Sequence, residues 1–363
     1  MITIDDSREL DTHRRQDAMG HVLASLRDAP RRARMFREAL EAVAGTRRYL
    51  HWSQGTGQSE PYVLDSDDPV DLLYQLGLCQ SGRFMMRINQ HASRLFLTDG
   101  VWVPKPSRVF PFCDESASLI DFAHESGWAR QADCILDVGS GCGHTALAFD
   151  RPRQFLLDIN PRALAYAEIN RLLNELDPQR YLVRLNDIRS GLVLPAFESR
   201  PNSVLLLANL PFAPCPARGL MPLDSDGGPS GIDLQVAALR ALKTFSRQLP
   251  SGTRVRAILL GLSPGNAATG SWLLEQAAGL LLGPERVEWH RCNDQLLRID
   301  GRRGLPNPSP VDKALLAIAG CTLENPDRAQ RRRVAGAYER LAAAHLKKGH
   351  TDLTYGFLKL RVA

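Results

Sequence analysis

The chain has 363 residues, of which 44% are hydrophobic and 23% are charged, an ordinary balance for a globular protein. Its formal net charge of +5 is small and the arginines are scattered along the chain, so composition does not favour a nucleic-acid partner. No segment reaches about 18 uninterrupted apolar residues, so we expect no transmembrane helix and no membrane partner.

Two further features of the sequence predict a cytoplasmic location. The seven cysteines include no C-x-x-C pair, which indicates neither a disulfide framework nor a metal site and suits a reducing compartment. The N-terminal stretch MITIDDSRELDTHRR has no apolar core, so it does not resemble a secretory signal.

The first hundred residues predict a mixed, largely helical accessory domain. Apolar residues recur at steps of three and four on both sides of Pro30, which indicates two helices within residues 8–48. In chain order there follow a Gly/Ser/Gln-rich loop at 51–60, a short helix at 69–79 and a hairpin of 83–90 with 93–100. The proline-rich segment 101–112 is the expected junction, so we predict domains 1–100 and 101–363.

From Asp133 onward, short apolar runs alternate with segments of helical periodicity. This alternation predicts an α/β fold with a doubly wound, mostly parallel sheet, in which ligands bind at the carboxyl ends of the strands. The predicted strands are CILDVGSG, RQFLLDIN, YLVRLND, SVLLLANLP and RVRAILLGLSP, and the helices between them are 161–176 and 231–249.

Polar residues stand at the end of each of the first four strands. The first strand leads into DVGSGCG, whose glycines allow either a tight turn or the close approach of a ligand, and whose Asp137 could meet an ammonium group. The second strand ends in Asp158, which is placed to bind a ribose diol. The alternative is that it caps the helix that opens at Pro161, and both roles can hold together. The third and fourth strands end in Asn186-Asp187 and in Asn209.

These strand ends resemble the class I S-adenosylmethionine-dependent methyltransferases over residues 100 to 295. LDVGSGCG is similar to the motif for the methionine part of the cofactor, LLDINPRAL to the ribose motif and LND to the adenine-contacting segment. No dehydrogenase-type G-x-G-x-x-G is present. The resemblance implies S-adenosylmethionine as the cofactor, bound by Asp137, Gly139, Ser140, Gly141, Gly143, Asp158, Ile159, Asn186, Asp187 and Asn209.

The same resemblance implies a seven-stranded sheet whose last strand is antiparallel. The final segment TDLTYGFLKLRV fits this last strand, and ERVEWHRCN is the expected sixth strand beside it.

The segment NLPF, residues 209–212, resembles the Asn-Pro-Pro-Tyr motif of enzymes that methylate planar nitrogens. Release-factor glutamine methyltransferases are the most similar overall, since GGPSGID at 227–233 and FPFCDES at 110–116 resemble further segments of theirs, while NLPF also resembles adenine dimethylases of ribosomal RNA. By this resemblance the Asn209 oxygen and the Leu210 carbonyl accept N–H bonds from the acceptor nitrogen. Pro211 stiffens the turn and Phe212 stacks on a flat substrate.

The departures from the family pattern favour a small acceptor. Leu210 replaces the usual first proline, and Phe212 lacks a hydroxyl. The accessory domain is longer than in release-factor enzymes, and residues 294–350 form an insert with a proline-rich loop, 301–310, and a helix. Both additions look like lids over the strand ends, which suits a small metabolite better than a ribosome or a release factor.

The sequence leaves several alternatives open. A closed site without an acceptor would suit cyclisation of S-adenosylmethionine itself, as in azetidine-2-carboxylate synthases, which resemble this family. A protein glutamine or an RNA base as acceptor, and a scaffold that binds the cofactor without catalysis, are further alternatives. The acceptor atom and the oligomeric state are not determined.

Overall fold

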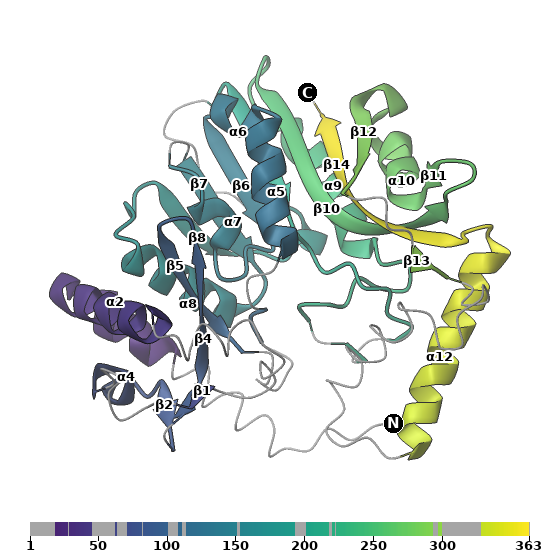
Figure 1. Ribbon diagram of the computed structural model, residues 1–363. Helices are drawn as coiled ribbons and strands as arrows, with labels where there is room; N and C mark the ends of the chain where they lie inside the picture. Colours follow the sequence, from purple (N-terminus) through teal and green to yellow (C-terminus); the bar gives the residue numbers. More distant parts are fainter. Residues whose placement is uncertain are drawn as a thin grey trace. The chain divides into compact units, whose positions relative to one another are not determined.

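The computed structural model describes residues 19–27, 29–45, 62–63, 71–81, 83–100, 108–110, 114–150, 153–192, 201–217, 220–221, 223–292, 297–299 and 328–362 (Figure 1). The predicted loops 51–60 and 301–310 lie outside the described residues. Across the helices that are described, none combines the length and the apolar character that a membrane crossing requires.

Contacts divide the chain into two compact units. The first unit comprises residues 1–114 and 140–185, and the second comprises 115–139 and 186–363. The boundary between domains 1–100 and 101–363 stays a prediction.

The N-terminal part of the first unit contains the predicted helices and hairpin. Residues 19–27 are helical, and the next helix begins at Pro30, as expected from the fixed φ of proline. The expected helix at 69–79 is shorter, because Gly77 adopts a φ of +70° and a strand follows it. The elements are α2 (Pro30–Gly45), β1 (Tyr62–Val63), α4 (Asp71–Gln75), β2 (Cys79–Gln80), β3 (Arg83–Phe84), β4 (Met86–His91) and β5 (Arg94–Asp99).

These strands form two small antiparallel sheets. One has the order β1-β3-β2, and the other is the predicted hairpin of β4 with β5, in which Met86 pairs with Asp99.

The remainder of the first unit is a β-α-β segment. It contains α7 (His144–Leu147), β7 (Arg153–Asp158), α8 (Pro161–Leu173) and β8 (Tyr181–Leu185), with β7 parallel to β8. Helix α8 begins as its sequence predicts, with Pro161 in the first turn and the Asn160 side chain accepting the Arg162 N–H. The residue that caps α8 is therefore Asn160, which removes the alternative that Asp158 is the cap.

The second unit contains a five-strand portion of the sheet in the order β12-β14-β10-β9-β6. Strands β6, β9 and β10 are parallel, whereas β14 is antiparallel to both β10 and β12, between which it lies (Figure 1). The bounds are β6 (Cys134–Val138), β9 (Ser203–Ala208), β10 (Arg254–Asn266), β12 (Val287–Arg291) and β14 (Asp352–Arg361), with the short β11 (Ser271–Trp272) and β13 (Leu297–Arg298).

The helices of the second unit are only partly predicted from the sequence. Helix α9 lies within the predicted segment 231–249, and α12 is the helix predicted within the insert 294–350, whereas α5, α6 and α10 were not expected. The bounds are α5 (Asp114–Glu125), α6 (Trp128–Gln131), α9 (Asp233–Ser246), α10 (Leu273–Leu282) and α12 (Arg328–Lys347), with 3-10 turns η2 (Ile188–Ser190) and η3 (Pro284–Arg286).

The fold class predicted from the sequence is confirmed. All five predicted parallel strands form, strand six is β12, and the last strand, β14, is antiparallel and pairs with it. The fold is therefore α/β, with a mostly parallel sheet in which the last strand of the chain is antiparallel, the arrangement that the resemblance to class I methyltransferases implied.

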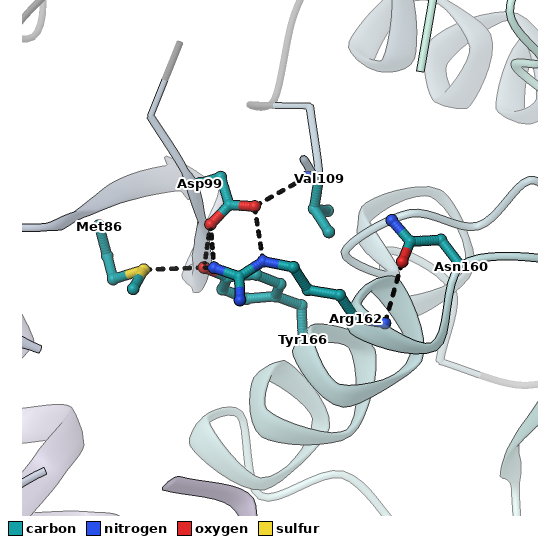
Figure 2. Close-up of polar contacts among 6 residues, drawn as sticks. All are labelled: Met86, Asp99, Val109, Asn160, Arg162 and Tyr166. Atoms are coloured by element: carbon teal, nitrogen blue, oxygen red, sulfur yellow. Dashed lines mark hydrogen bonds and ion pairs between the residues drawn. The ribbon is translucent and has the colours of Figure 1, made fainter. Parts of the chain in front are cut away.

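A buried ion pair joins the N-terminal hairpin to α8 within the first unit (Figure 2). Both carboxylate oxygens of Asp99 accept bonds from the Arg162 guanidinium, at 2.5 and 2.9 Å, and both side chains are buried. Asp99 also accepts the Val109 N–H at 2.9 Å and the Tyr166 hydroxyl at 2.7 Å. The Tyr166 oxygen lies 2.7 Å from the sulfur of Met86.

The interactions within this cluster favour a charged Arg162 and a neutral Tyr166. Burial by itself would lower the pKa of Arg162, but the interactions with Tyr166 and Asp99 outweigh it and raise that pKa. Burial, together with the Asp99 charge, raises the pKa of Tyr166, which therefore stays a neutral hydroxyl donor. The cluster satisfies every oxygen of a fully buried carboxylate, as a buried charge requires.

We predict that Asp99→Asn lowers the free energy of unfolding by about 3 kcal/mol or more, because it leaves the Arg162 charge buried and uncompensated. The matched control is Glu41→Gln, which removes the exposed Arg37–Glu41 pair on α2 and should cost about 0.5 kcal/mol or less. Urea titrations followed by circular dichroism measure both. Equal losses in the two variants would show that the cluster does not hold the hairpin on α8.

Candidate active site

The glycine loop after β6 adopts a left-handed backbone conformation, which glycine reaches without strain. Gly139, Gly141 and Gly143 have φ values of +71°, +53° and +84°, a region that residues with a Cβ rarely adopt. A Cβ at Gly143 would lie 3.0 Å from the Leu156 side chain, so this glycine is also required by packing. A Cβ at Gly141 would meet nothing within 4 Å. Gly141 therefore turns the chain while leaving open space on that side.

Asp158 ties the end of β7 to the glycine loop. One carboxylate oxygen accepts the Gly141 N–H and the other accepts the Asn160 N–H, each at 2.8 Å. Burial raises the pKa of Asp158, while backbone bonds from Asn160, Gly141 and Ile159 act in the opposite direction. A carboxylate has about four acceptor positions, so capacity for a further hydroxyl donor remains.

Two aliphatic side chains are exposed at the ends of β7 and β8 in the first unit. Ile159 is 37% exposed and Leu185 is 62% exposed, whereas the strand residues Phe155, Leu156 and Leu157 are buried. The Ser140 hydroxyl is buried, and it has no hydrogen-bond partner among the residues that the structure describes. A donor or acceptor without a partner in such a position is unfavourable unless a ligand completes it.

The polar residues at the end of β8 are held in a local turn of the second unit. The Asn186 amide donates to the Gly191 carbonyl at 2.9 Å. Asp187 caps η2 by accepting the Arg189 N–H, and it also forms an ion pair with the Arg189 guanidinium. The hydrogen bonds from Arg189 lower the pKa of Asp187, which keeps this carboxylate ionised. The adenine contact implied for these residues stays a prediction.

In the second unit, the first residue after β9 is Asn209, and it is half-buried. Its amide nitrogen donates to the Ser116 hydroxyl of α5 at 2.9 Å. The oxygen of the Asn209 amide is therefore the end that does not bond Ser116. Asp137, on β6, is 1% exposed.

Leu210 and Pro211 are held on two sides. The buried Leu210 side chain packs on Gly139, where an added Cβ would lie 2.7 Å from Leu210 Cδ2. The Gln235 amide nitrogen, from α9, lies 3.3 Å from the Leu210 carbonyl and 3.4 Å from the Pro211 carbonyl. The Leu210 carbonyl therefore already accepts one bond, and its second lone pair is the one available to an acceptor nitrogen.

The GGPSGID segment lies directly against the backbone of Phe212. A Cβ at Gly227 would stand 2.7 Å from both Cα and C of Phe212, and one at Gly231 would stand 2.7 Å from the Phe212 carbonyl oxygen. Ala213 donates to the Ser225 carbonyl and accepts the Gly227 N–H, at 3.1 and 3.0 Å. The resemblance of this segment to the release-factor enzymes thus corresponds to a structural brace for the NLPF tip.

Phe212 joins a hydrophobic cluster that includes the helix of the insert. Its ring packs edge-on against Tyr355 with the centroids 5.5 Å apart. Val334 and Tyr338 of α12 belong to the same cluster. Farther along α12, a ring nitrogen of His345 lies 3.2 Å from the Pro229 carbonyl of the GGPSGID segment. The α12 part of the insert therefore packs beside the NLPF tip within the second unit.

Sequence reasoning missed two residues that hold the tip, Ser116 and Gln235. Ser116 falls in the segment FPFCDES, which was noted only for its resemblance, and Gln235 is a polar residue on the buried face of α9. A fully buried glutamine was the available signal, because a buried polar side chain requires partners.

Comparisons with known proteins give low similarity throughout. No family model matches the sequence, and no curated protein matches it. A putative sarcosine dimethylglycine methyltransferase from Galdieria sulphuraria is 13% identical over 68% of this chain and 85% of that one, with a TM-score of 0.36. Trm5b from Pyrococcus abyssi is 13% identical over 76% of this chain and 56% of that one, also at 0.36.

The YcgJ protein from Bacillus subtilis is 12% identical over 68% of this chain and 97% of that one, with a TM-score of 0.34. Because all three TM-scores are low, these likenesses carry no argument about activity. The assignment of the fold rests on the order and direction of the strands.

We predict that Gly227→Ala destabilises the protein by about 1–3 kcal/mol, because its Cβ would overlap the Phe212 backbone, which has no room to move away. The control is Gly279→Ala in α10, where the nearest atoms are 3.6 Å away and the exchange should be neutral or stabilising by up to about 1 kcal/mol. Thermal unfolding and urea titration measure both. Equal stability of the two variants would mean that the brace is looser than the structure shows.

Proposed function

We propose that the protein is an S-adenosylmethionine-dependent methyltransferase that methylates a nitrogen of a small metabolite by in-line displacement. One observation supports the cofactor part most strongly: the Asp158 carboxylate is anchored by the Gly141 N–H, so that a ribose-binding acid and a glycine loop form one arrangement. The proposed cofactor-binding residues are Asp137, Gly139, Ser140, Gly141, Gly143, Asp158, Ile159, Asn186, Asp187 and Asn209.

Several features of the first unit fit such a cofactor. The Ser140 hydroxyl lacks a partner among the described residues, and Gly141 borders open space. The exposed Ile159 and Leu185 offer aliphatic surface to a flat ring, while Asp158 retains capacity for a ribose hydroxyl. When bound, S-adenosylmethionine supplies an electrophilic methyl group.

The protein's own contribution to the reaction is to position the acceptor. An amide or ring-attached amine is a weak nucleophile, because its lone pair is delocalised. If the Asn209 oxygen and the Leu210 carbonyl each accept one N–H bond, the lone pair is aimed in one direction, and positioning supplies most of the rate gain. Pro211 keeps this turn rigid and Phe212 gives the acceptor a face to stack on.

A small acceptor is supported by the packing of α12 beside Phe212, as expected for an insert that closes the acceptor side. In this proposal residues 1–100 form an accessory domain, 101–363 form the catalytic domain, and 294–350 act as its lid. Nucleic acid and membranes are not proposed as partners. A reducing, cytoplasmic location is proposed because Cys79, Cys134, Cys142, Cys215 and Cys292, which the structure describes, are free thiols.

We predict that Asp158→Ala weakens the binding of S-adenosylhomocysteine by about tenfold or more, because hydrogen bonds to a charged group contribute about 1.5–3 kcal/mol each. Isothermal titration calorimetry measures the affinity. The control is Asp177→Ala, which removes an exposed carboxylate that likewise accepts a backbone N–H, from Gln179, and should leave the affinity unchanged. Unchanged affinity in Asp158→Ala would remove the ribose assignment.

We predict that Asn209→Ala slows turnover by about a hundredfold, the effect expected when reacting groups are misplaced by about 1 Å. Cofactor affinity should fall far less, because nine further residues are proposed to bind the cofactor. Turnover is the rate at which S-adenosylhomocysteine forms from S-adenosylmethionine with an acceptor found by screening small amines and amides. A parallel reaction without acceptor, analysed for methylthioadenosine, distinguishes methyl transfer from cyclisation of S-adenosylmethionine itself. Wild-type turnover in the variant would show that NLPF is only a structural turn. Methylthioadenosine as the main product would contradict methyl transfer.

A further inference from the structure

We propose that Tyr338 of α12 is a further acceptor-binding residue, whose hydroxyl donates to the heteroatom conjugated with the methylated nitrogen. The inference rests on the proposed function and deepens it, because it states which nitrogen compounds the site takes. These are primary amides and ring-attached amines, whose carbonyl oxygen or ring nitrogen can accept this bond, and not simple alkylamines. The observation that carries it is a buried Tyr338 hydroxyl without a hydrogen-bond partner among the residues that the structure describes.

A buried hydroxyl without a partner is unfavourable for the protein before a ligand binds. Tyr338 is 5% exposed, so folding removes its hydroxyl from water and provides no described residue to replace that water. Phenylalanine would fill the same space and leave no polar group unsatisfied. The described contacts therefore give this hydroxyl no structural use, whereas a ligand that bonds it would explain its presence.

Tyr338 belongs to the cluster that surrounds the aromatic ring on which the acceptor is proposed to stack. It shares this hydrophobic cluster with Phe212 and Tyr355, whose rings lie edge to face. Tyr338 is buried, whereas Phe212 and Tyr355 are half-buried, so the cluster is less enclosed at the ring that would carry the acceptor. A flat acceptor on Phe212 is therefore a neighbour of Tyr338.

The groups around the Tyr338 hydroxyl leave its proton in place and available. Burial raises the pKa of Tyr338, and the charges of Cys215 and Asp226 raise it further. The Cys215 thiol donates to the Ala217 carbonyl at 3.0 Å, and an Asp226 oxygen accepts the Gly228 N–H at 2.9 Å. The hydroxyl therefore remains an O–H group whose proton no described residue accepts, and it can rotate toward a ligand atom.

The chemistry of a delocalised nitrogen supplies the partner for this proton. Its lone pair is delocalised because a C=O or C=N group is conjugated with it, and the oxygen or ring nitrogen of that group accepts hydrogen bonds. In the proposed function the N–H groups of the acceptor bond to Asn209 and Leu210. The conjugated heteroatom then needs a donor, which Tyr338 provides. An alkylamine has no such heteroatom and gains nothing from the hydroxyl.

Tyr338→Phe tests this proposal, because it removes one oxygen and keeps the aromatic ring in the cluster. The substrates come from a panel in which each primary amide or ring-attached amine is matched with an alkylamine of similar skeleton, such as benzamide with benzylamine. Turnover is measured as the formation of S-adenosylhomocysteine, and kcat/KM is determined for the planar compounds that react. The matched alkylamine is measured as a substrate, or as an inhibitor that competes with its planar counterpart.

We expect Tyr338→Phe to lower kcat/KM for the planar compound by about fivefold or more, because a buried heteroatom of the ligand loses its donor. The values for the matched alkylamine, and the affinity for S-adenosylhomocysteine by calorimetry, should stay within about twofold, because neither ligand bonds the hydroxyl. The melting temperature should rise by about 2 °C, because the variant no longer buries an unsatisfied hydroxyl.

Tyr181→Phe is the matched control, because it removes a tyrosine hydroxyl that has a partner. The Tyr181 hydroxyl donates to the Phe149 carbonyl at 2.8 Å in the first unit, away from the residues proposed to bind the acceptor. This variant should therefore lower the melting temperature and leave the preference between planar compound and alkylamine unchanged.

Three results would overturn the role of Tyr338. An unchanged kcat/KM for the planar compound, or an equal loss for planar compound and alkylamine, would show that the hydroxyl does not bond the conjugated heteroatom. A lower melting temperature of Tyr338→Phe would show that the hydroxyl already has a partner. Wild-type protein that methylates alkylamines and no planar compound would exclude the proposed class.

Failure of the proposed function gives a different result. Wild-type protein that methylates no compound of the panel, or that releases methylthioadenosine without an acceptor, would contradict methyl transfer to a small nitrogen compound, and the role of Tyr338 would fall with it. The melting temperatures of Tyr338→Phe and Tyr181→Phe would still show whether the Tyr338 hydroxyl lacks a partner.

Discussion

The contact between the backbone of Phe212 and the glycines at 227 and 231 is the constraint on which the proposed acceptor site depends. A side chain at either glycine would lie 2.7 Å from the Phe212 backbone, so the two segments approach as closely as main chains allow. Packing of this kind fixes position more firmly than a side-chain contact, because a backbone cannot move aside by changing rotamer. The half-buried Asn209 and Phe212 side chains are thus presented by a tip that is itself rigid.

Helix α8 has a comparable role in the first unit. Its Arg162 holds the N-terminal hairpin through the buried Asp99. About two turns farther along α8, the Asn170 amide donates to the Leu97 carbonyl at 3.1 Å and to the Cys142 carbonyl at 2.8 Å. One asparagine therefore links the hairpin to the glycine loop. The hairpin, predicted as part of an accessory domain, is by these bonds also a support for the loop that is proposed to bind the cofactor.

The strands were predictable and several helices were not, for different physical reasons. Buried parallel strands produce continuous apolar runs, which stand out in the sequence, and a polar residue marks the end of each of the first four. Helix α10, LLEQAAGLLL, is apolar except at Glu275 and Gln276, and its Leu280 is 90% exposed, so its apolar residues do not mark out the buried face, which contains Leu274 and Ala278. Helix α5 buries only Leu119, Ile120 and Ala123 over twelve residues, a pattern too sparse to identify it.

Some residues of the candidate site could be predicted from the local sequence, and others could not. The glycine loop and Asp158 were identified from the strand ends. Segment 227–233 was noted only for a resemblance, and its packing against the Phe212 backbone was not predicted. Ser116 lies 93 positions from Asn209, and Gln235 lies 25 from Leu210, so neither bond leaves a local pattern. Only the assembled fold brings such partners together. The choice between Asp158 and Asn160 as the cap of α8 likewise required the geometry of the turn.

The central claim is that Asp158 and the glycine loop form the cofactor-binding part of a methyltransferase. A crystal structure of the protein with S-adenosylhomocysteine tests it most directly. The account predicts ribose hydroxyls within hydrogen-bond distance of the Asp158 carboxylate, the adenine ring against Ile159, and a ligand contact to the Ser140 hydroxyl. A ligand bound elsewhere, with Asp158 bonded only to the backbone around it, would contradict the account.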